Sequence, residues 1–137
     1  MFCCHFNRCF TGAQMKDLDK YNLVFQEFCE WVGGIEEDDP LPPEIKQIYF
    51  VFSCENGMNV LQYAGCEYEP KMICSFDYIP LEAQFFYSRE FIKLPSAEAK
   101  RFAEIFARDI LQKEEYANLF LNKTVKFVEL GQMIKRI

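Results

Sequence analysis

The residues best suited to chemistry lie in the opening stretch of the chain, MFCCHFNRCFTGAQM. Three cysteines and the single histidine occur there, and zinc binds these side-chain types. Structural zinc sites use two pairs of ligands, each pair separated by a few residues, whereas three of these donors are adjacent. The spacing therefore argues against a zinc site. The donors are Cys3, Cys4, His5 and Cys9.

The same stretch has two other interpretations besides an ordinary N-terminal extension. Paired cysteines near an N-terminus can carry two acyl chains, but only one basic residue, Arg8, lies close to them. Alternatively, translation starts at Met15, because one coding of residues 11–13 contains AGGAG, the shape of a bacterial ribosome-binding site. We favour the start at Met15. Residues 1–14 are then a leader or extension, and residues 15–137 form one domain.

Without that leader the domain contains no histidine. Serine and cysteine nucleophiles usually depend on a histidine base, so nucleophilic catalysis is not indicated. The four later cysteines lack a Cys-x-x-Cys motif and are interpreted as reduced thiols of a cytoplasmic protein. A turn between Cys66 and Cys74 would allow one disulfide between them. The four are Cys29, Cys54, Cys66 and Cys74.

Nucleotide and calcium sites find no support in the sequence. The six glycines form no phosphate-binding loop. The acidic run from Glu36 to Asp39 lacks the alternation and the glycine of a calcium loop. We therefore predict no catalytic residue, no metal and no cofactor.

Composition and charge limit the partners. The chain has 137 residues, 50% hydrophobic and 17% aromatic, which is typical of one globular domain. No apolar run approaches the roughly 20 residues that a membrane helix needs, so no membrane contact is predicted. The net charge is −6, and the acids are concentrated between Asp17 and Glu44. This distribution argues against nucleic-acid binding and favours a basic protein partner.

Hydrophobic periodicity predicts a helix near each end of the chain. The first covers residues 16–32 and ends at Gly33 and Gly34, because glycine readily closes a helix. The second runs from residue 97 to about residue 121, with Ser96 as its N-cap.

Between the helices the sequence predicts strands. Residues 48–54 are β-branched and aromatic, and Asn56-Gly57 after them indicates a two-residue hairpin turn. The turn fixes the pairing of the two strands. The predicted pairs are Cys54 with Asn59, Phe52 with Leu61, and Phe50 with Tyr63.

Further strands are predicted at residues 72–79, 85–92 and 124–130, although residues 85–92 could also be helical. The order of elements predicts an α+β fold. We expect an antiparallel sheet of about four strands, arranged as a meander, with the N-terminal and C-terminal helices packed on one face.

These features favour a non-catalytic protein-binding module, a small acidic cytoplasmic protein of bacterial type such as an immunity protein or a secretion chaperone. Aromatic residues would anchor the interface, and acids in a proline-rich connector would steer a basic partner. The alternatives are a small enzyme that uses carboxylates and a structural homodimer that buries the half-apolar second face of the sheet. The predicted partner-binding residues are Trp31, Glu36, Glu37, Asp38, Asp39 and Tyr49.

Overall fold

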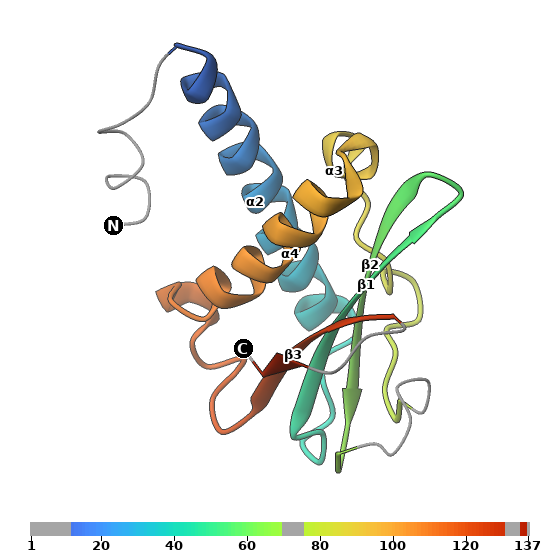
Figure 1. Cartoon of the computed structure of the whole chain (residues 1–137). Coiled ribbons are helices and arrows are strands. Elements are labelled where there is room, and N and C mark those ends of the chain that lie inside the picture. Colours follow the sequence, from blue (N-terminus) through green and yellow to red (C-terminus); the bar gives the residue numbers. More distant parts are fainter. Residues whose placement is uncertain (1–11, 70–75, 131–134, 137) are drawn as a thin grey trace.

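The computed structural model describes residues 12–69, 76–130 and 135–136, which form an α+β fold (Figure 1). Residues 12–14 of the predicted leader belong to the first helix, whereas residues 1–11 lie outside the described part. In chain order the elements are α2 (Gly12–Asp38), β1 (Gln47–Glu55), β2 (Met58–Cys66), α3 (Arg89–Lys93), α4 (Ser96–Ile110), the 3-10 turn η1 (Glu114–Tyr116), β3 (Thr124–Glu129) and β4 (Lys135–Arg136).

The sheet is mixed, with the strand order β2-β1-β3-β4. Strand β1 pairs antiparallel with β2 on one side and parallel with β3 on the other, and the two-residue β4 lies antiparallel to β3. The predicted antiparallel meander is therefore wrong. The chain returns from β2 through α4, and such a crossover brings β3 beside β1 in the same direction (Figure 1).

The hairpin between β1 and β2 is confirmed together with its register. Asn56 and Gly57 form the turn, with φ of 53° and 77°. Both values lie in the left-handed region, which Asn-Gly tolerates better than other pairs. The three predicted pairs are present: Cys54 with Asn59, Phe52 with Leu61, and Phe50 with Tyr63.

Two other predicted strands do not form in the described residues. Residues 76–79 make one isolated bridge, from Tyr78 to Gly65, and residues 72–75 lie outside the described part. Residues 85–92 make one bridge at Phe85 and then enter α3. The helix begins here because the Ser88 hydroxyl accepts a hydrogen bond from the Phe91 N–H. Residues 76–88 thus lie along the outer edge of β2.

Both predicted helices have different ends from those expected. Helix α2 continues through Gly33 and Gly34 to Asp38. Glycine inside a helix costs about 1 kcal/mol relative to alanine, but Val32 and Ile35 on either side are buried in the core and hold the helix together. Helix α4 ends at Ile110, the last buried residue of its apolar stripe.

The start of α4 also differs from the prediction. Ser96 is the first helical residue rather than the N-cap. Pro95 takes the capping position, and no side chain caps the helix there.

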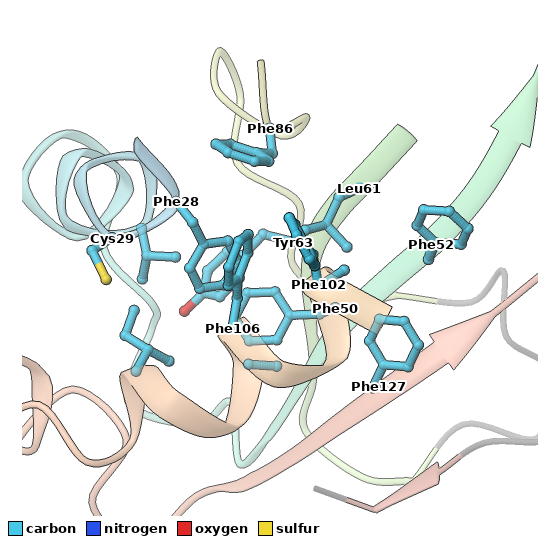
Figure 2. Packing of buried hydrophobic residues seen from close by; sticks show 14 of the residues in the cluster. Phe28, Cys29, Phe50, Phe52, Leu61, Tyr63, Phe86, Phe102, Phe106 and Phe127 are labelled. Carbon is cyan, nitrogen blue, oxygen red and sulfur yellow. The ribbon is translucent and has the colours of Figure 1, made fainter. Parts of the chain in front are cut away.

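The main core lies between the helices and one face of the sheet. Phe28 of α2 is at its centre, with its ring centroid 5.3 Å from that of Phe50 in β1 and 5.4 Å from that of Phe106 in α4 (Figure 2). A smaller cluster, which includes Tyr49 and Val51, covers the opposite face. Strand β1 is therefore buried on both faces.

None of the helices in the described residues combines the length and the hydropathy of a bilayer-crossing segment.

Candidate functional site

The four predicted acids lie at the C-terminal end of α2 and not in a proline-rich connector. Glu36, Glu37 and Asp38 belong to the last turn of the helix, and Asp39 follows it directly. That turn contains no basic residue, and the helix dipole places partial negative charge there. Among the ion pairs of the described residues, none includes any of the four acids. The end of α2 therefore concentrates negative charge that no ion pair of the described residues neutralises.

Asp39 joins the helix end to the segment that follows β2. Its carboxylate Oδ2 accepts a hydrogen bond of 2.8 Å from the Leu81 N–H, and its carbonyl oxygen accepts one of 2.5 Å from the Tyr78 hydroxyl. Burial raises the pKa of Tyr78, so this hydroxyl remains a donor. Asp39 therefore fixes residues 78–81 beside the acidic end of α2.

Two open grooves flank this helix end. One, of about 410 Å³, lies between α2 and η1 and is lined by Glu36, Glu37 and Glu115. The other, of about 280 Å³, lies between α2 and residues 80–83 and is lined by Asp38 and Asp39. The acids are thus divided between two concave surfaces on either side of the helix.

The carboxylate of Glu36 is partly buried beside the first of these grooves. Its Oε2 atom is buried without a hydrogen-bond partner. Burial raises the pKa of Glu36 above its ordinary value of 4.5, while a hydrogen bond from the Leu41 N–H and the charge of Lys123 act in the opposite direction. The residues that line the groove beside it include no serine, threonine, cysteine or histidine. The groove therefore offers an acid or base but no usual nucleophile.

The two predicted aromatic residues are not surface anchors of the same kind. Trp31 is half-buried, and its indole Nε1 donates a hydrogen bond of 2.7 Å to the Ala83 carbonyl. It therefore holds the segment after β2 against α2. Tyr49 is 0% exposed, with the Lys126 ammonium 5.6 Å from its ring centroid. Because its side chain is buried, Tyr49 is not available at the surface to contact a partner.

The sequence interpretation missed an exposed apolar segment beside these acids. Ile79, Leu81, Phe85 and Tyr87 are all exposed. The sequence signal was the density of large apolar residues in IPLEAQFFY, which spans the end of the strand predicted at residues 72–79 and the start of the strand or helix predicted at residues 85–92. Their exposure depends on how the segment lies on β2, and periodicity along the chain does not contain that information.

The described cysteines differ in their surroundings. Cys29 and Cys66 are buried, and Cys54 is exposed. Cys74 lies outside the described residues, so the Cys66–Cys74 pair stays a prediction. In the described part of the chain, no group of three His, Cys, Asp or Glu side chains is arranged to hold a metal ion.

We expect alkylating reagents to distinguish two of these thiols. Burial raises the pKa of Cys29 to about 11, so little thiolate is present at neutral pH. A short pulse of iodoacetamide on the native protein should label Cys54 at least about tenfold faster than Cys29, measured by peptide mass spectrometry. In urea the two rates should converge. Equal rates in the native protein would contradict the burial of Cys29.

Comparison of the chain with protein-family models, with curated proteins and with solved structures gave no match. The functional interpretation therefore rests on geometry. Its two elements are the acidic end of α2 and the exposed apolar segment beside it.

Proposed function

We propose that the protein is a non-catalytic binding module that captures a basic segment of another protein with the acidic end of α2. The observation that carries this proposal is the excess of acids at this helix end: among the described residues, no ion pair includes Glu36, Glu37, Asp38 or Asp39. Acids at the negative end of a helix raise the free energy of the folded protein. Such an arrangement is typical of a functional surface, where stability is lost in exchange for recognition.

The acids would act mainly on the rate of association. An exposed ion pair contributes about 0–1 kcal/mol, so no single acid determines the affinity. A cluster of like charges instead attracts an oppositely charged partner over a Debye length of about 8 Å at physiological salt. An immunity protein or a secretion chaperone would work in this way on a cationic partner. We also propose that it acts in the cytoplasm, which the free thiols of Cys29 and Cys54 support.

The test uses the double variant Glu37→Gln/Asp38→Asn. Both side chains are exposed, whereas Asp39 has a structural hydrogen bond. The probe is a fluorescent Lys/Leu peptide of about 14 residues, long enough to form an amphipathic helix on binding. Stopped-flow fluorescence at low salt should show an association rate about tenfold lower for the variant than for the wild type. High salt should reduce this difference.

The matched control is Glu55→Gln/Glu90→Gln, which removes the same charge from exposed acids of β1 and α3. It should change the association rate less than about twofold. Equal losses in the two variants would mean that only net charge matters. The end of α2 would then not be the docking site.

The two alternatives have less support. The homodimer was expected to bury the second face of the sheet, but Tyr49 and Val51 of that face are already buried within the chain. The enzyme alternative rests on Glu36 alone, since its groove is open and is lined by no usual nucleophile.

A further inference from the structure

Exposed apolar side chains gather on one segment of the described surface. Nine large hydrophobic residues are exposed on the whole of the described surface, and four of these nine lie in the segment from Ile79 to Tyr87. Leu81 and Tyr87 are 85% and 79% exposed. Single exposed apolar residues are ordinary, but a cluster of them marks an interaction surface. We call the four residues the apolar ribbon: Ile79, Leu81, Phe85 and Tyr87.

The ribbon is held in place by its backbone and by the residues between its members. Tyr78, Pro80 and Phe86 are buried, so the chain alternates between core and solvent at residues 78–81 and again at residues 85–88. The Gln84 carbonyl accepts a hydrogen bond of 3.0 Å from the Tyr63 N–H of β2. In Figure 1 the yellow-green segment that contains the ribbon runs beside β2 towards α3. A partner would therefore meet a surface whose backbone is already ordered, which lowers the entropic cost of binding.

The ribbon adjoins the acidic end of α2. Leu81 lines the same groove as Asp38 and Asp39, and Glu82 lines it too. The hydrogen bond from the Leu81 N–H to the Asp39 carboxylate fixes this contact at 2.8 Å. Apolar and negative surface are thus continuous across the groove.

The combination of apolar and negative surface favours one kind of binding partner over the others. A second copy packed ribbon to ribbon would bring two acidic helix ends together, in a chain whose net charge is −6. A neutral apolar partner would leave the acids unpaired at the rim. A segment with an apolar face and basic flanks matches both parts of the surface.

We propose that the apolar ribbon and the acidic end of α2 form one docking surface for an amphipathic basic segment of another protein. Apolar side chains of that segment cover Leu81 and Phe85, and its lysine or arginine side chains lie beside Asp38 and Asp39. This inference rests on the proposed function, to which it adds the apolar half of the recognition.

The test compares three peptides on the wild-type protein by fluorescence anisotropy. The Lys/Leu peptide described above is paired with a Lys/Ser peptide without the apolar face and a Glu/Leu peptide with the charge reversed. The Lys/Leu peptide should bind at least about tenfold more tightly than either of the other two. Binding of the Lys/Ser peptide with equal affinity would overturn the apolar half of the proposal.

Protein variants locate the binding. Leu81→Ser/Phe85→Ser should weaken the binding of the Lys/Leu peptide about tenfold or more. The control Leu23→Ser/Leu121→Ser removes two other exposed leucines and should change the affinity less than about twofold. Circular dichroism of each variant checks that the fold is intact.

The outcomes separate this inference from the proposed function. If the ribbon variant binds normally while Glu37→Gln/Asp38→Asn binds weakly, the ribbon is not used and the proposed function stands. If only the ribbon variant is impaired, the acids are not used, and the proposed function fails together with the acidic half of this inference. If no peptide binds, both fail. A dimer in sedimentation velocity that the ribbon variant abolishes would make a second copy the occupant and overturn the inference.

Discussion

Replacing Phe28 with alanine is expected to destabilise the fold by about 3–5 kcal/mol, the usual cost of removing a fully buried phenylalanine. The side chain is 0% exposed, and rings from three other parts of the chain surround it. Phe50 of β1, Phe86 of the segment before α3 and Phe106 of α4 have centroids 5.3, 5.8 and 5.4 Å away. The cavity would adjoin all of these parts at once, so no single element could move to fill it.

Urea unfolding followed by circular dichroism and by Trp31 fluorescence measures this effect. The matched control is Leu23→Ala on the same helix, where the side chain is exposed. It should change the free energy of unfolding by less than about 0.5 kcal/mol. If the two variants were equally stable, Phe28 would not be at the centre of the core.

The parts of the fold that were predictable from the sequence are local. The register of β1 and β2 follows from Asn56-Gly57, because a two-residue turn leaves only one pairing of the strands. The parallel pairing of β1 with β3 was not predictable in this way. It joins Gln47 to Thr124 across most of the chain, and no turn residue specifies it.

The difference between local and long-range features also explains which parts of the candidate site were predictable from the sequence. The acidic run was evident, but its position was wrong because Gly33 and Gly34 were interpreted as a helix end. Burial of Val32 and Ile35, a tertiary effect, keeps those glycines helical. Similarly, the exposure of Leu81 depends on Trp31 of α2 and on Asp39 directly after this helix, which form hydrogen bonds with the backbone of its segment. Residues so far apart in sequence give no joint signal in a single chain.

Asn59 supports the far end of the apolar ribbon. Its side-chain Nδ2 donates hydrogen bonds of 2.8 Å to the carbonyl oxygens of Phe91 and Leu94, at the end of α3. At the start of α3, the Ser88 hydroxyl donates to the Glu27 carboxylate of α2. The short helix is therefore fastened at both ends, and Tyr87 of the ribbon directly precedes Ser88.

Asn59→Asp is expected to destabilise the protein by about 3 kcal/mol or more, although the two side chains have the same shape. Asn59 is buried, and the substitution would place a carboxylate oxygen where the amide now donates to two carbonyl oxygens, so that like partial charges would face each other. Asn59→Leu removes the hydrogen bonds without adding a charge, so it should cost less, about 1–3 kcal/mol. Urea unfolding at neutral pH measures both values.

The structure also predicts which part of the protein should lose stability first in the Asn59→Asp variant. Since Asn59 binds α3, hydrogen exchange of the Phe91 and Leu94 amides should accelerate more in Asn59→Asp than exchange in the β1–β3 pairing. Loosening of α3 should extend to Tyr87 and lower the affinity of the protein for the Lys/Leu peptide, even though Asn59 lies outside the docking surface. If the Asn59→Asp and Asn59→Leu variants were equally stable, the aspartate carboxylate would not lie against the carbonyl oxygens of Phe91 and Leu94. The conclusion that β2 anchors α3 through Asn59 would then be wrong.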